Sequence, residues 1–177
     1  MRFLPTSLPG VLVVEPDLRE DDRGFFARTW CRDEFAAAGV PTEWVQCNVS
    51  FNRRAGTLRG MHWQAAPHEE AKLVRCTAGA AFDVVLDVRT GSPTLGKWVA
   101  VELTAANRRA VFIPGGFAHG FQTLADGTEL FYHMSATYHP EAARGVRWDD
   151  PAFAIAWPPC DVRVIAARDL SFPDFAP

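Results

Sequence analysis

The chain has 177 residues, 48% hydrophobic and 22% charged, a composition typical of a globular protein of one domain. A net charge of −3, with no basic block longer than two arginines, disfavours a nucleic-acid-binding protein. No apolar run approaches the roughly 18 residues of a membrane span, and the first residues, MRFLP, do not resemble a secretory signal. We therefore expect one cytoplasmic domain over residues 1–177, with neither a membrane nor a nucleic acid as partner.

Short segments rich in β-branched and aromatic residues recur between turn residues. They predict strands over residues 11–15, 25–30, 43–51, 57–63, 71–77, 81–89, 97–104, 109–113, 119–124 and 128–135. One early helix is expected over residues 32–38, with Gly39 ending it. Strands at this spacing are typical of a β-sandwich or barrel, so the predicted class is all-β with a few short helices.

The four cysteines, Cys31, Cys47, Cys76 and Cys160, are far apart and form no CxxC pair. This spacing excludes a zinc ribbon and a thioredoxin-type redox pair. We expect buried free thiols.

Alternation along the predicted strands places ionisable side chains on apolar faces. Lys72 shares a face with Val74, and His62, His119 and Tyr132 take similar positions in their own strands. Any one of them could be a hydrogen-bonded core residue, because burying an unpartnered charge costs several kcal/mol. Four together predict a pocket, because ionisable groups with shifted pKa values gather where chemistry occurs.

Residues 114–119, PGGFAH, have the PxGxxH spacing of the second cupin motif, in which a tight turn directs the histidine inward. Metal-binding cupins have an upstream HxH motif, whereas the corresponding residues here are His62-Trp63-Gln64. An amide is a poor ligand for a transition metal. The remaining ligands of a metal site could come only from loop residues, namely His68, Glu69 or Glu70. We expect no metal and keep a metal-dependent cupin enzyme as an alternative.

The expected pocket holds the groups needed to remove a proton next to a carbonyl. A neutral imidazole such as His62 is a suitable base near pH 7. Tyr132, with an ordinary phenol pKa near 10, is a suitable acid for protonating a carbanion. The Lys72 ammonium could stabilise a developing enolate oxygen. These three residues indicate a reaction class, without a substrate.

The chain resembles the dTDP-4-dehydrorhamnose 3,5-epimerases over nearly its whole length. The resemblance rests on blocks at residues 22–26 (DRGFF), 46–50 (QCNVS), 57–64 (TLRGMHWQ), 71–75 (AKLVR), 83–89 (DVVLDVR), 92–94 (SPT), 113–121 (IPGGFAHGF) and 148–151 (WDDP). It implies a cupin-type jelly-roll (double-stranded β-helix) barrel, a homodimer, no metal and no cofactor.

The resemblance also implies catalytic roles. His62 would remove protons at C3 and C5 of a nucleotide-linked 4-keto-6-deoxyhexose, by default dTDP-4-dehydro-6-deoxy-D-glucose. Asp169 would pair with His62 and raise its basicity. Tyr132 would return a proton from the opposite face, and Lys72 would stabilise the enolate.

Further residues would bind the nucleotide sugar. Arg23 would reach in from the neighbouring subunit, and Tyr138 would stack against the substrate. The diphosphate and sugar would contact Gln46, Asn48, Arg59 and His119, and Arg168 takes the place of the family's substrate-binding lysine.

Four residues depart from the family pattern. Arg28 stands where an acidic residue is expected, Ala143 replaces a glutamate, Arg168 replaces a lysine, and Thr137 replaces an aromatic residue. These changes leave the catalytic set intact. They leave open a single-site 3- or 5-epimerase, a different nucleotide, or a non-catalytic nucleotide-sugar binder.

Arg59 and His62 fall on opposite faces of an ideal strand, yet the resemblance places both at the substrate. A bulge or twist at Gly60 would reconcile them.

Overall fold

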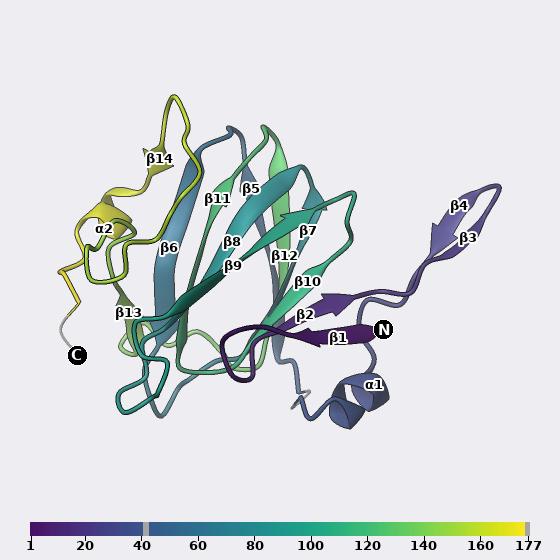
Figure 1. Ribbon diagram of the computed structural model, residues 1–177, viewed down its shortest axis with the longest axis horizontal. Coiled ribbons are helices and arrows are strands. Elements are labelled where there is room, and N and C mark those ends of the chain that lie inside the picture. The colour runs from purple at the N-terminus through teal and green to yellow at the C-terminus, as the bar shows by residue number, and fades with distance from the viewer. Residues whose placement is uncertain (41–42, 176–177) are drawn as a thin grey trace.

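The computed structural model describes residues 1–40 and 43–175, and most of it consists of two sheets that are antiparallel apart from one short parallel pair, β14 with β6. One sheet has the order β1-β2-β10-β7-β12-β5, and the other has the order β13-β6-β11-β8-β9 with β14 beside β6. The sheets pack face to face as a cupin-type jelly roll (Figure 1). The predicted all-β class is confirmed.

The first sheet contains β1 (Arg2–Pro5), β2 (Leu12–Glu15), β5 (Gln46–Asn52), β7 (Lys72–Ala78), β10 (Ala110–Ile113) and β12 (Thr128–Met134). The second contains β6 (Thr57–Gln64), β8 (Ala80–Asp87), β9 (Trp98–Thr104), β11 (Phe117–Thr123), β13 (Ala143–Gly145) and β14 (Val164–Ile165). The remaining elements are the hairpin strands β3 (Arg19–Asp21) and β4 (Gly24–Phe26) and the helices α1 (Arg32–Ala37) and α2 (Ala167–Leu170). No helix in the described part of the chain is long and apolar enough to cross a membrane.

The core between the sheets is built from the inward faces of their strands. Val74 and Leu130 of the first sheet meet Val85, Leu103 and Phe121 of the second in one buried cluster. Burying a side chain of this size contributes roughly 1.5–3 kcal/mol. The alternation that buries Val74 is the same one that turns Lys72 inward.

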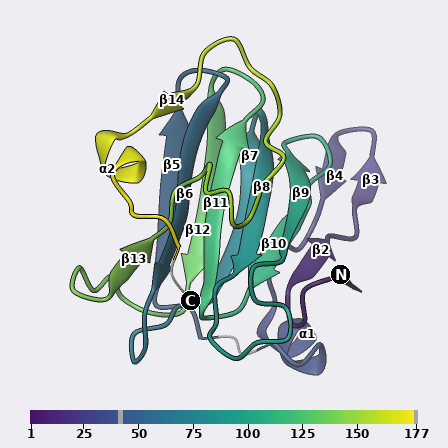
Figure 2. The same cartoon turned by 60° about the vertical axis from the view of Figure 1, so that its left-hand side comes forward.

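Two further apolar clusters cover the outer faces of the sheets. Phe35 of α1 packs with Leu73 and Phe112 on the first sheet. On the second, Val84 and Leu86 meet side chains of the chain's last third, including Val146, Phe153 and Trp157. This C-terminal segment runs across the sheet and brings α2 to β6 (Figure 2).

Most expected strands are present with ends shifted by a few residues. The strand expected over residues 25–30 is an exception, because β4 ends at Phe26. It pairs only with β3, in a hairpin that stands away from the sandwich, so residues 27–30 have no partner strand (Figure 1). The helix expected over residues 32–38 is α1.

All four cysteines are free thiols, as expected. The expectation that they are buried is correct for Cys76 but wrong for Cys47 and Cys160, which are exposed. Cys47 lies on β5, an edge strand, where one side of the sheet is open.

Candidate active site

A cavity of about 460 Å³ lies between the two sheets, and residues of both sheets and of the α2 region line it. Its lining consists of Asn48, Val49, Ser50, Arg59, His62, Glu70, Lys72, His119, Phe121, Tyr132, Met134, Ala166, Arg168 and Asp169. His62 and Tyr132 therefore face the same cavity, one from β6 and the other from β12.

A bulge at Gly60 lets Arg59 and His62 face the cavity together. β6 pairs with β11 as His62↔His119 and Arg59↔Phe121, so β6 holds one extra residue between these pairs. Gly60 has φ +139°, and a Cβ there would lie 2.5 Å from the Gly120 Cα. Only glycine fits this close approach without strain, and the expected bulge is confirmed.

His62 and Asp169 form a hydrogen-bonded pair with 2.7 Å between Nε2 and Oδ1. The other carboxylate oxygen accepts the Gly60 backbone N–H at 3.2 Å. Burial raises the pKa of Asp169, but the hydrogen bonds from His62 and Gly60 and the charge of Arg168 outweigh it, so the pKa lies below its usual value. A carboxylate held ionised in this way orients the imidazole and leaves its Nδ1 to take up a proton.

Tyr132 is positioned to act as an acid. Burial, and then the nearby Asp83 carboxylate, raise the pKa of the phenol well above its usual value, while Arg59 lowers it by a smaller amount. The phenol therefore stays protonated through the neutral range. Its ring meets His119 edge to face, with 6.1 Å between the centroids.

Two buried carboxylates take roles in the site that the sequence analysis did not predict: Asp83 was not singled out, and Glu70 was named only as a possible metal ligand. Asp83 lies 2.8 Å from His119 Nε2, and Glu70 lies 2.8 Å from Lys72 Nζ. Asp83 shares the inward face of β8 with Val85, and a carboxylate on a buried face needs a partner. That position was a usable signal, and so was the placement of Glu70 two residues before Lys72.

The structure brings most of the predicted site residues together. The cavity contains four predicted catalytic residues (His62, Lys72, Tyr132 and Asp169) and four predicted binding residues (Asn48, Arg59, His119 and Arg168). Three predicted binding residues do not line it. Gln46 donates to the Ala136 carbonyl, Tyr138 is exposed, and Arg23 pairs with Asp21 at the tip of the hairpin.

Gln64, at the position of the second cupin histidine, lies outside the cavity lining. Its buried amide donates to the His68 and Thr137 carbonyls and accepts the His139 backbone N–H. It thereby joins the loop that carries His68 to the loop that carries Thr137 and His139. Among the described residues that line the cavity, no three His, Cys, Asp or Glu side chains converge as a metal site.

Comparisons with known proteins found a matching family model and similar proteins over nearly the whole chain. The family model for dTDP-4-dehydrorhamnose 3,5-epimerase matches residues 5–177. The enzyme of that description from Sinorhizobium fredii is 44% identical over 177 residues, covering 98% of this chain and 89% of the relative. A dTDP-4-dehydrorhamnose 3-epimerase from Streptomyces niveus is 43% identical, covering 89% of this chain and 76% of the relative.

A solved structure has nearly the same fold. The crystal structure of a dTDP-4-dehydrorhamnose 3,5-epimerase from Bacillus anthracis, with TDP and PPi bound, is 36% identical. It superposes with a TM-score of 0.95 and covers 98% of this chain and 99% of the other.

Proposed function

The chain belongs to the dTDP-4-dehydrorhamnose 3,5-epimerase family and is an epimerase, and we propose that it inverts C3, C5 or both in a dTDP-linked 4-keto-6-deoxyhexose. The observation that carries this proposal is the shared cavity of His62 and Tyr132, with His62 bonded to Asp169. A base and an acid that face one cavity from different sheets can act on opposite faces of a bound sugar ring.

The reaction begins at the carbon next to the ketone. His62 takes the proton through Nδ1, and the Asp169 carboxylate stabilises the imidazolium that forms. The electron pair left on carbon moves onto the C4 oxygen as an enolate. The Lys72 ammonium, which is buried in the cavity wall, stabilises this oxygen.

The second half of the reaction inverts the centre. Tyr132 donates its proton to the opposite face of the enolate carbon, and the ketone re-forms. The raised pKa of Tyr132 keeps this proton in place until the carbanion forms. Solvent then restores the protonation states of both residues, so the cycle consumes no cofactor.

The cations at the cavity bind the diphosphate. Arg59 is held by a 2.9 Å hydrogen bond from Nε to the buried Asn52 amide oxygen, which leaves its terminal nitrogens for an anion. Arg168 lines the same cavity beside Asp169. His119 and Asn48 face the sugar from β11 and β5.

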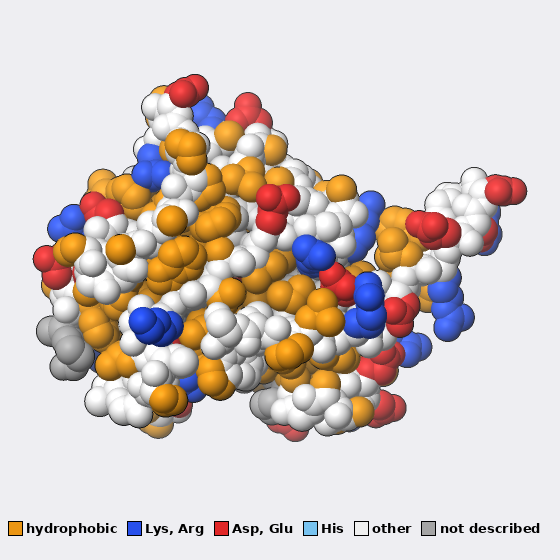
Figure 3. All heavy atoms as spheres, viewed as in Figure 1, with side chains coloured by type: hydrophobic (Ala, Val, Ile, Leu, Met, Phe, Trp, Pro, Cys, Tyr) orange, Lys and Arg blue, Asp and Glu red, His pale blue; other side chains and the backbone are white. Residues whose placement is uncertain are grey.

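The active form is a homodimer. The β3–β4 hairpin, which stands away from the sandwich (Figure 1), carries Arg23, with its side chain 89% exposed, and Phe26, 74% exposed. Figure 3 places hydrophobic and charged side chains together on this projecting hairpin. The edge strand β5 exposes Val49 and Phe51. In a dimer, the second copy of the chain would cover these apolar side chains, and Arg23 of each copy would reach the cavity of the other.

Deuterium wash-in tests the function. The enzyme is incubated with dTDP-4-dehydro-6-deoxy-D-glucose in heavy water, and C3 and C5 are followed by NMR. Deuterium at both carbons supports a 3,5-epimerase, and deuterium at one supports the single-site alternative that the 43% identical 3-epimerase favours. No exchange at either carbon, in a protein that still binds the nucleotide, contradicts the proposed substrate. His62→Ala is the control that should abolish exchange.

A further inference from the structure

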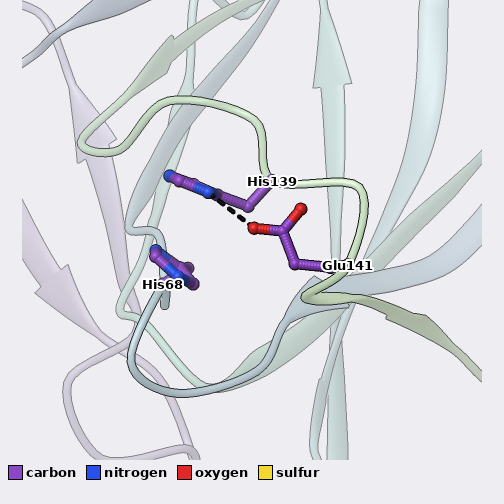
Figure 4. Close-up of side chains that lie close together, drawn as sticks. All are labelled: His68, His139 and Glu141. Atoms are coloured by element: carbon purple, nitrogen blue, oxygen red, sulfur yellow. Dashed lines mark hydrogen bonds and ion pairs between the residues drawn. The ribbon is translucent and has the colours of Figure 1, made fainter.

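A cluster of two histidines and a glutamate lies on two loops outside the cavity. His68 and His139 stack with 3.7 Å between ring centroids and 19° between planes, and the His139 Nδ1 lies 3.0 Å from Glu141 Oε1 (Figure 4). One ligand atom from each residue lies within 4.8 Å of the others. Among residues 1–40 and 43–175, this is the one such group of three.

The cluster is held by a buried scaffold. The Gln64 side chain hydrogen-bonds to the His68 carbonyl at 2.9 Å, to the Thr137 carbonyl at 3.1 Å and to the His139 backbone N–H at 2.6 Å. These bonds fix the backbone of both histidines relative to β6. The two rings are therefore brought together by the fold, although 71 positions separate them in the chain.

The second nitrogen of His139 has a partner of the kind that metal-bound histidines use. Thr137 Oγ1 lies 3.3 Å from Nε2. A metal at Nδ1 would move the ring proton to Nε2, where the hydroxyl oxygen accepts it. The Glu141 side chain is 68% exposed, so it can rotate toward the ion without disturbing packed neighbours. Water would fill the coordination positions of the ion that the three side chains leave open.

We propose that His68, His139 and Glu141 bind one divalent transition-metal ion of the Zn²⁺ type. Two imidazole nitrogens and a carboxylate oxygen form a donor set that suits this ion. Ligand atoms in a tetrahedral Zn²⁺ site lie about 3.4 Å apart. The in-plane lone pairs of the two stacked rings run side by side, so ion binding requires both rings to rotate until these lone pairs converge. The ion would clamp the loop that carries Glu70 to the loop that carries Tyr138.

The site does not take part in the epimerisation, because none of its three residues lines the cavity. Metal binding at this cluster and epimerisation in the cavity can therefore be tested independently, and failure of one would not contradict the other. The bound ion should stabilise the fold, since it ties the two loops together and binds the native state alone.

Calorimetric titration of metal-free protein with Zn²⁺, with elemental analysis after dialysis, tests the site. We expect one ion per chain. His68→Ala and His139→Ala should each weaken binding by at least about 100-fold, and Thr137→Val by about 10-fold, as expected for an outer partner. Glu69→Gln removes an exposed carboxylate from the same loop and should leave binding unchanged. Circular dichroism checks that every variant is folded.

Two further readouts complete the test. At a hundred-fold excess over Kd, Zn²⁺ should raise the melting temperature of the wild type by about 5–10 °C and that of His68→Ala not at all. Co²⁺ should give a visible spectrum without thiolate charge-transfer bands, which excludes the exposed Cys47 and Cys160 as ligands. No saturable binding, binding that survives both histidine variants, or thiolate bands would each overturn the proposal.

Discussion

Lys72 Nζ lies 2.8 Å from Glu70 Oε1 at the wall of the active-site cavity, and the two side chains are only 7% and 9% exposed. A buried ammonium needs a counter-charge, since an unpaired one is costly to desolvate. Glu70 supplies this counter-charge, and the enolate oxygen becomes a second anionic partner of Lys72 during the reaction. The pair links the stability of the site to its chemistry.

Variants of this pair separate its effect on stability from its effect on catalysis. Lys72→Met and Glu70→Gln should each lower the free energy of unfolding by about 3 kcal/mol, because each leaves one buried charge unpaired. The double variant should recover most of this loss. Its turnover should nevertheless stay about 10²–10³-fold below the wild type, since enolate stabilisation is gone. Urea unfolding and steady-state kinetics on the four proteins measure both quantities. Equal destabilisation in the double variant would contradict the pairing.

Tyr132→Phe should uncouple proton exchange from inversion. His62 can still remove the proton and return it to the same face, so deuterium should enter the sugar. Inversion should fall by about 10²–10⁴-fold, because the acid on the other face is missing. NMR of the product in heavy water distinguishes deuterated substrate from epimer.

Because the pKa of Tyr132 is raised above its usual value, wild-type turnover should show no loss from phenol ionisation up to about pH 10.

Asp87 should make stability sensitive to acid. This buried carboxylate accepts hydrogen bonds from Arg89, Ser92 and Thr94. Burial raises its pKa, but the hydrogen bonds from Arg89, Ser92 and Thr94 outweigh this and hold the pKa far below its usual value. A lowered folded-state pKa gives stability that is complete above the unfolded-state value near 3.8 and is lost as the pH falls past it.

Between pH 5 and pH 3 this group alone should therefore cost about 1 kcal/mol of the free energy of unfolding. Asp87→Asn should be less stable than the wild type at pH 5, and the gap should shrink by that amount at pH 3. Urea unfolding at the two pH values measures it. A gap that stays constant would mean that Asp87 titrates alike in both states.

The bulge at Gly60 should be required for both stability and activity. In Gly60→Ala the new methyl group meets the Gly120 backbone at 2.5 Å, and φ +139° is unfavourable for alanine. We expect a loss of about 2–4 kcal/mol and a large fall in turnover, because Arg59 and His62 lose their common orientation. Gly127→Ala is the matched control. It also has a positive φ, but its Cβ has open space, so it should cost about 1 kcal/mol and leave turnover unchanged.

The part of the site that alternation could predict is correct. Lys72 and Tyr132 face the cavity because successive side chains of a strand point to opposite faces of the sheet, and the conflict between Arg59 and His62 pointed to the bulge at Gly60. Gln46 also lies on a predicted strand, yet its amide turns to the Ala136 carbonyl instead. Strand periodicity predicts the face of the sheet on which a side chain lies, but it does not predict the hydrogen-bond partner of a flexible polar side chain.

The amino-acid sequence by itself determined the all-β class, the inward faces of the strands and, through the family blocks, the reaction. The family blocks also implied that Asp169 pairs with His62, whereas the tertiary structure alone decided that Asp83 meets His119. Asp169 reaches His62 across 107 positions because the C-terminal segment packs over the second sheet, and Asp83 meets His119 only because β8 and β11 are neighbours. Such pairs depend on distances between chain segments, which local pattern does not encode.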